Sequence, residues 1–172
     1  HTDSSAASDV YKRQEKHIMP ENKLVPVPDG VSNEVASCVT LKGITAEYLL
    51  HRAYPLKKGD KVLYHAAAGA LGQILCPWAN SIGAEIIGTV GSKEKEKIAK
   101  KNGCHHVINY TEKNFVEEVE KIVGKNEIDV VYDGVGLKTF EGSIEVLKIR
   151  GMMVAFGNAS GYVDTIDVKK HI

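Results

Sequence analysis

The rhythm of hydrophobic and polar positions becomes regular from residue 61 onward. Short apolar runs alternate there with longer segments in which apolar residues recur every three to four positions. Continuous apolar runs are typical of strands buried on both faces, and the longer period is that of an amphipathic helix. The predicted strands are residues 61–65, 85–90, 106–109, 129–133 and 151–156. The predicted helices between them are residues 70–81, 92–102, 112–123 and 138–147.

This alternation predicts the fold class. Strands separated by helices of this length form a parallel sheet with helices on both faces. We therefore expect an α/β fold, a Rossmann-type doubly wound parallel sheet that is incomplete, with about five strands and the sixth missing. Three of the strands are followed by Gly91, Gly134 and Gly157, at the edge where such sheets bind ligands. Each could be an ordinary turn glycine, but the set together indicates a site.

The chain before residue 61 is less regular. Residues 1–17 are polar and aperiodic, and they are predicted to be non-native or disordered. Prolines at alternate positions in residues 24–28 (LVPVP) favour an extended segment over a central strand. Ser32 can cap a helix over residues 34–38 or beyond, and a second helical run is expected over residues 45–53.

The turn after the first predicted strand is a candidate phosphate-binding loop. We call residues 66–72 (AAAGALG) the glycine loop, because Gly69 and Gly72 stand among small residues there. Such a loop lets the backbone approach a pyrophosphate, and the following helix offers free N–H groups. Ala67 replaces the first glycine of the pattern G-x-G-x-x-G, so the motif alone is weak evidence. A Walker-type loop is excluded because no Gly-Lys-Ser/Thr follows.

The end of the second predicted strand bears on which dinucleotide would bind. NAD-type folds place an acid there to hold the ribose 2′-hydroxyl, and such an acid would repel a 2′-phosphate. No acid occurs in residues 86–93, so this chain lacks that obstacle to NADPH. Ser92 stands at a predicted helix N-terminus, which favours an anion, and Lys95 follows it. The lysines of this helix are equally typical of a solvated helix face.

Composition and charge narrow the function classes. Lys+Arg and Asp+Glu both number 22, and this balance disfavours nucleic-acid binding through a basic field. No apolar run approaches the roughly 20 residues that a membrane-spanning helix needs. Cys38, Cys76 and Cys104 are widely spaced, which fits a reducing compartment and disfavours a metal site. His65 is interpreted as a satisfied core histidine or one that ends a strand, and Asp133 as a residue that ends a strand, so the catalytic residues stay unknown.

Four stretches carry a more specific signal. They are residues 42–50 (KGITAEYLL), residues 62–72 (VLYHAAAGALG), residues 106–110 (HVINY) with 131–136 (VYDGVG), and residues 150–161 (RGMMVAFGNASG). In order and spacing they resemble the zinc-independent quinone oxidoreductase branch of the medium-chain dehydrogenase/reductase superfamily, the ζ-crystallin-like NADPH:quinone reductases. The family's glycine loop commonly ends Gly-Gly-Val-Gly, and Ala70 and Leu71 stand here in place of the Gly-Val pair.

The resemblance implies the domain organisation and a set of cofactor-binding residues. Residues 18–58 would be a linker and hinge helices from the border of a missing catalytic domain, and residues 59–172 a truncated NADP-binding domain. The glycine loop would hold the pyrophosphate, a second group the adenosine 2′-phosphate, and a third the nicotinamide and its ribose. These residues are Gly69, Ala70, Leu71 and Gly72; then Ser92, Lys95 and Tyr110; then Thr45, Val135, Gly136, Phe156, Gly157 and Asn158.

Two of these residues also have simpler explanations. Thr45 on its own would be a helix residue bonding back to its own backbone. Tyr110 on its own could be an ordinary aromatic residue at a strand end. Zinc-dependent relatives place a catalytic ligand just before the Gly/Thr segment of the hinge helix, and Leu41 stands at about that place here. The resemblance therefore implies the zinc-free branch.

The implied activity is hydride transfer from NADPH to a small-molecule quinone, with the protein mainly positioning the reactants and excluding water. An enone, alkenal or enoyl reductase of the same superfamily is an alternative, as is a crystallin-like protein that binds the cofactor without turnover. The resemblance further implies a cytoplasmic, homodimeric full-length protein without nucleic-acid or membrane partners. We expect little reductase activity from these residues alone, because the substrate half would be missing.

Overall fold

The computed structural model describes residue 18 and residues 20–166, so the prediction for residues 1–17 lies outside the described residues. The chain divides into two compact units, residues 1–38 and residues 39–172. In the first unit, a short 3₁₀ helix η1 (Glu21–Lys23) is followed by a segment without regular structure. Helix α2 (Asn33–Glu47) begins after Ser32, whose hydroxyl accepts a hydrogen bond from the Val35 amide at 3.3 Å, as its residue type predicts.

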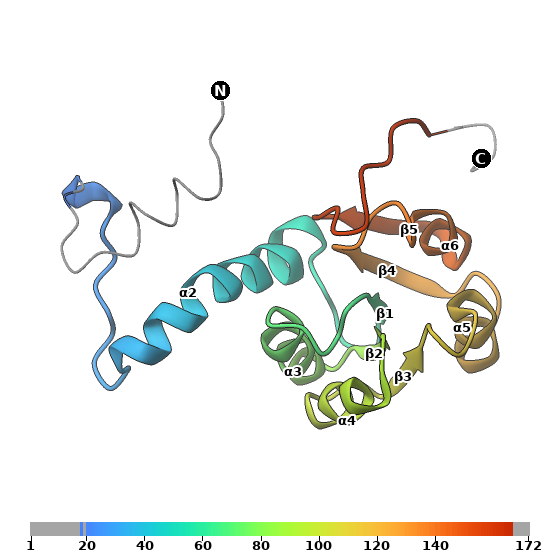
Figure 1. The fold of residues 1–172 in the computed structure, drawn as a ribbon, viewed down its shortest axis with the longest axis horizontal. Coiled ribbons are helices and arrows are strands. Elements are labelled where there is room, and N and C mark those ends of the chain that lie inside the picture. Colours follow the sequence, from blue (N-terminus) through green and yellow to red (C-terminus); the bar gives the residue numbers. More distant parts are fainter. Residues whose placement is uncertain (1–17, 19, 167–172) are drawn as a thin grey trace. The chain divides into compact units, whose positions relative to one another are not determined.

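The second unit contains one five-stranded parallel sheet (Figure 1). The strand order is β3-β2-β1-β4-β5, so the chain moves outward from β1 in one direction and then in the other. This arrangement confirms the predicted α/β, doubly wound fold. The strands are β1 (Lys61–Tyr64), β2 (Glu85–Val90), β3 (His106–Asn109), β4 (Ile128–Asp133) and β5 (Leu147–Ala155).

Helices cover both faces of the sheet, because successive strand residues point to opposite faces. Val62 and Tyr64 lie in one core with residues of α3 and α4, whereas Leu63 between them lies in a second core with α5. Both cores consist of side chains that are almost fully buried. The helices are α3 (Gly72–Ile82), α4 (Lys93–Lys101), α5 (Phe115–Val123) and α6 (Phe140–Glu145).

The helical region before the sheet is continuous. Instead of two separate runs, α2 passes directly into the π-helix η2 (Tyr48–Ala53). Leu49 and Leu50 of η2 are fully buried, and the Tyr132 hydroxyl of β4 donates to the Leu49 carbonyl oxygen at 3.0 Å. The end of the helix is thus attached to the sheet by both packing and a buried hydrogen bond.

Several element boundaries differ from the predicted ones for identifiable reasons. Helix α5 begins later than predicted because the Asn114 side chain accepts the Val116 amide and caps it. Strand β5 begins earlier than predicted because Leu147 already pairs with Ile128, before an irregularity in the register. The predicted helix over residues 138–147 is correspondingly shorter.

Candidate functional site

The carboxyl ends of all five strands meet at one edge of the sheet. The register pairs Tyr64 with both Gly88 and Tyr132, and it pairs Asp133 with Ala155. The loops that leave these strands therefore start side by side, which is where open α/β sheets bind ligands. Besides the glycine loop, we name the β4 end loop (residues 134–139) and the β5 end loop (residues 156–161).

The glycine loop is packed tightly against the end of β2. The Ala67 amide donates to the Thr89 carbonyl oxygen at 3.0 Å, and the Gly69 amide donates to Ala66 at 2.8 Å. A Cβ atom on Gly72 would lie only 2.3 Å from the Ala67 carbonyl oxygen. Only glycine fits at position 72 in this conformation. Helix α3 begins at Gly72, and the first amides of a helix have no carbonyl groups within that helix to accept them.

The structure explains why alanine is accommodated at position 67. The Ala67 methyl group is buried against Gly88 of β2, where an added Cβ would lie 2.6 Å from it. The glycine missing from the loop is thus balanced by a glycine on the neighbouring strand. The loop can therefore keep its tight conformation although Ala67 replaces the first glycine of the motif.

A second group of predicted site residues gathers at the ends of β2 and β3. The Tyr110 hydroxyl oxygen would lie 2.6 Å from a Cβ on Gly91, so the phenol lies directly over the residue that follows β2. Ser92 caps α4, its hydroxyl oxygen accepting the Lys95 amide at 3.4 Å. The Lys95 side chain is exposed. The structure therefore places these residues around one helix N-terminus, which is electropositive.

The third group lies in the loops after β4 and β5. Asp133 is fully buried, and its Oδ1 accepts the amides of Val135 at 2.7 Å and of Gly136 at 3.0 Å. The β4 end loop in turn binds the β5 end loop, because the Ala159 amide donates to Gly134 at 3.2 Å and the Ser160 amide donates to Val135 at 2.7 Å. Asp133 thereby shapes both loops.

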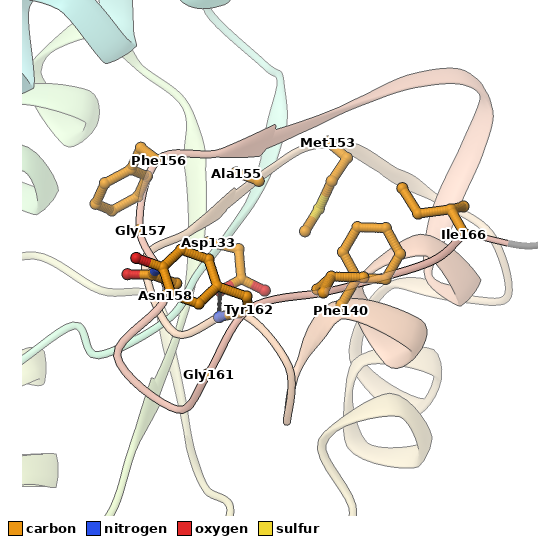
Figure 2. A pocket seen from close by; sticks show the side chains of 12 residues that line it. Asp133, Phe140, Met153, Ala155, Phe156, Gly157, Asn158, Gly161, Tyr162 and Ile166 are labelled. Carbon is orange, nitrogen blue, oxygen red and sulfur yellow. Dashed lines mark hydrogen bonds between the residues drawn. The ribbon is translucent and has the colours of Figure 1, made fainter.

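These two loops line a pocket of about 460 Å³. Four of the five residues predicted in the loops line it, namely Gly136, Phe156, Gly157 and Asn158. Figure 2 shows Asp133, Phe140 and Asn158 around the same pocket, although they come from β4, α6 and the β5 end loop.

Within the third predicted group, Thr45 is the residue that lies outside the β4 and β5 end loops. It is half-buried on α2, and its hydroxyl donates to the Leu41 carbonyl oxygen at 2.8 Å, which is the simpler of the two expectations for this residue. Its described hydrogen bond therefore stays within its own helix.

A buried group of polar side chains was not predicted from the sequence as a unit. His65 Nδ1 lies 2.9 Å from the Thr89 hydroxyl, and His65 Nε2 lies 2.9 Å from the Ser143 hydroxyl. Ser143 Oγ donates to Asp133 Oδ2 at 3.2 Å. Burial lowers the pKa of His65 to about 4, against the opposing effect of the Asp133 charge, so the ring is neutral at pH 7. Only the polar residues ending otherwise apolar strands could have signalled this group.

Metal coordination has no candidate site in the part of the chain that the structure describes. No group of three or more His, Cys, Asp or Glu side chains is placed to hold an ion there. Likewise, none of the helices among the described residues is both long and apolar enough to cross a bilayer.

Comparison with known proteins decides the family. The model of the zinc-binding dehydrogenase family matches residues 70–172, which is more than half of the chain. The chain belongs to this family. The match includes the end of the glycine loop, the group of residues around Gly91 and both pocket-lining end loops.

Relatives of this dehydrogenase-family chain are similar over most of its length. A 2-haloacrylate reductase of a Burkholderia species is 46% identical over 90% of this chain and 47% of the relative. A quinone oxidoreductase of Pseudomonas aeruginosa is 42% identical over 90% of this chain and 47% of the relative. The chain thus spans about half the length of the curated relatives it matches.

The fold is likewise similar to that of a solved relative. The crystal structure of Escherichia coli quinone oxidoreductase complexed with NADPH superposes with a TM-score of 0.82 and 44% sequence identity. The superposition covers 85% of this chain and 45% of that one. This similarity confirms the expected resemblance to quinone oxidoreductases.

Proposed function

We propose that the chain is the NADPH-binding part of an oxidoreductase that transfers a hydride to a quinone. The observation that carries the proposal is the group at the end of β2, where Tyr110 lies over Gly91 beside the capped start of α4. A side chain on residue 91 would meet the Tyr110 phenol, so the acid typical of NAD sites would require this exposed ring to move away. The similarity to an NADPH complex supports the same cofactor.

The residues fit a bound dinucleotide. Because a side chain on Gly72 would meet the Ala67 carbonyl oxygen, the backbone turns tightly at the start of α3, and a tight turn before a helix N-terminus suits a pyrophosphate. In this proposal Gly69, Ala70 and Leu71 complete that cradle. When bound, NADPH supplies the hydride from its nicotinamide ring.

The remaining proposed contacts divide between the two halves of the cofactor. Ser92, Lys95 and Tyr110 hold the 2′-phosphate. The ring and its ribose lie against the pocket and against Thr45 of α2, with the contacting loop residues being Val135, Gly136, Phe156, Gly157 and Asn158. The domain that binds the cofactor begins at about residue 59. We assign the protein the tasks of orienting the ring and keeping water away from it.

The test is a fluorescence titration of the chain with NADPH and with NADH. We expect NADPH to bind at least about tenfold more tightly, because Lys95 and the helix N-terminus favour the extra phosphate. Lys95→Glu should remove most of this preference and leave NADH binding unchanged. Lys97→Glu, an equally exposed charge reversal on the same helix, is the matched control. Equal affinity of the wild-type chain for both cofactors would contradict the proposal.

An activated alkene is the second candidate for the hydride acceptor. The observation in its favour is the 46% identity to a protein named 2-haloacrylate reductase. NADPH oxidation by the protein at its full natural length, measured with a benzoquinone and with 2-chloroacrylate, distinguishes the two. Faster turnover of the quinone supports the main proposal. Tight NADPH binding without turnover of either compound would instead support a crystallin-like binding role.

We also propose that the protein is zinc-independent, cytoplasmic and, at full length, homodimeric. Leu41, an apolar residue just before the Gly43–Thr45 turn of α2, supports the first point. Cys38, Cys76 and Cys104 are free thiols, which supports the second. The third rests on the family resemblance alone. Metal analysis should find less than about 0.1 zinc per chain, and sedimentation velocity should show a dimer.

A further inference from the structure

The buried polar side chains beneath the pocket form one connected series, which we call the polar chain: Thr89, His65, Ser143 and Asp133. Each of these residues is at most 1% exposed. They come from four places in the fold, namely the ends of β2, β1 and β4 and the middle of α6. Because a buried polar group without a partner is costly, a series that is satisfied at every link is held in one arrangement.

The direction of each hydrogen bond follows from the chemistry of Asp133. Its carboxylate can only accept, and it is a stronger acceptor than a neutral ring nitrogen, so the Ser143 hydroxyl donates to it. Ser143 has then used its proton and must accept from His65 Nε2. His65 is therefore protonated on Nε2 alone, and its Nδ1 accepts a hydrogen bond from the Thr89 hydroxyl.

Asp133 connects this series to the pocket. Its carboxylate has four described donors: the amides of Val135 and Gly136 and the hydroxyls of Thr139 and Ser143. None of the four carries a positive charge, so the buried carboxylate depends on all of them being in place. Because three of the donors belong to the β4 end loop, that loop can keep its shape only while the carboxylate keeps its orientation.

The other end of the polar chain connects to the glycine loop. His65 immediately precedes this loop, and the Thr89 carbonyl oxygen accepts the Ala67 amide at 3.0 Å. Phe115 of α5 closes the side of the imidazole, with ring centroids 5.0 Å apart in an edge-to-face contact. The same few buried atoms thus hold the loop proposed for the pyrophosphate and the loop proposed for the nicotinamide.

We propose that His65 and Ser143 are positioning residues, which act through Asp133 to hold the β4 end loop in the shape that receives the nicotinamide half of NADPH. This inference rests on the function proposed above. It assigns the two residues no contact with the cofactor and no part in proton transfer. Their contribution is to fix the carboxylate of Asp133, and through it the pocket wall that Gly136 lines and that Figure 2 shows around Asn158.

The experiment compares two ligands on the chain. NADPH contacts both halves of the proposed site, whereas adenosine 2′,5′-bisphosphate reaches only the adenosine half. Ser143→Ala removes the middle link, and we expect NADPH affinity to fall at least about tenfold while bisphosphate affinity changes less than about twofold. If Ser143 only stabilised the fold, Ser143→Ala would change the affinity for the two ligands to the same extent.

Thr89 provides a matched pair of variants. Thr89→Val removes the hydroxyl at nearly constant volume, and it should weaken NADPH in the same direction as Ser143→Ala. Thr89→Ser keeps the hydroxyl and should bind both ligands as the wild type does. Equal weakening of both ligands by Ser143→Ala or Thr89→Val, or unchanged NADPH affinity, would overturn the inference.

The protonation state of His65 gives a test that requires no variant. A long-range ¹H–¹⁵N spectrum of the wild-type chain at pH 7 should show a neutral ring with its proton on Nε2. The Nδ1-protonated form or an imidazolium would overturn the inference even if a variant failed to fold. If the wild-type chain bound neither ligand, the proposed function itself would fail and this inference with it. If the wild type bound both but the variants showed no separation, only this inference would fail.

Discussion

Single residues at this site are constrained mainly by backbone contacts, which a list of residue types does not reveal. The glycine loop shows this most clearly. The position that the motif leaves without glycine, Ala67, fits because Gly88 on the neighbouring strand leaves room for its methyl group. At Gly72, one of the two glycines that the motif retains, a carbonyl oxygen lies where a side chain would be. The same loop therefore tolerates a methyl group at one position and excludes it at another.

Replacing Gly72 with alanine tests this constraint. The new Cβ would lie 2.3 Å from the Ala67 carbonyl oxygen, so the backbone must move. We expect the free energy of unfolding in urea to fall by about 1–3 kcal/mol, the usual cost of overpacking, and NADPH binding to weaken. Gly43→Ala is the control, because its Cβ would meet only the exposed Val39 side chain at 3.3 Å within a helix. A Gly72→Ala variant as stable as the control would contradict this explanation.

At the scale of elements, the sequence pattern predicts the short inner strands most closely, whereas strand β5 and the helices differ from their predicted bounds. Strands β2 and β3 have the predicted bounds, because a short apolar run between turn residues has few alternative placements. The helices differ more, because their ends depend on caps and on what packs against them. The passage from α2 into η2 is one example. It is held by Tyr132 of β4, which is far away in the sequence.

Tyr132→Phe tests that attachment. The change removes the hydroxyl that donates to the Leu49 carbonyl oxygen at 3.0 Å and leaves the ring in place. Because the bond is buried, we expect the free energy of unfolding to fall by about 1–2 kcal/mol, as measured by urea denaturation. Tyr48→Phe, on the same π-helix but half-exposed, should have almost no effect. Equal losses in the two variants would show that the hydrogen bond is not what holds the helix end.

At the scale of the whole molecule, the buried imidazole links folding to pH. Burial lowers the pKa of His65 to about 4, below its ordinary value of about 6.5 in an unfolded chain. Between these pH values the unfolded state binds more protons than the folded state, so stability decreases as the pH falls. Of the described groups bonded into the polar chain, Thr89 and Ser143 do not ionise in this range, and Asp133 is the one carboxylate.

We therefore expect the free energy of unfolding to fall by about 3 kcal/mol between pH 6.5 and pH 4. Urea denaturation at several pH values measures this. In His65→Gln the same interval should show a much smaller decrease. Hydrogen bonds lower the pKa of the exposed Glu118, so its contribution begins to be lost only below about pH 4.5, and the His65→Gln variant shares this loss, which the comparison therefore subtracts. A wild-type chain equally stable at both pH values would contradict the buried neutral ring.

The sequence by itself determined the fold class and the candidate ligand edge, and four of its stretches carried the resemblance to the family. The fold class and the ligand edge follow from local information, since apolar runs, helix caps and glycines at strand ends report their own immediate surroundings. Only the tertiary structure decided that Ala67 is compatible with the glycine loop, that Tyr110 covers Gly91, and that His65 has partners. Each of these depends on atoms from different strands or helices that meet only when the sheet forms. The partners of His65 are Thr89 on β2 and Ser143 on α6, which are 24 and 78 positions away in the sequence. Their contacts place a histidine that looked isolated at the centre of the polar chain.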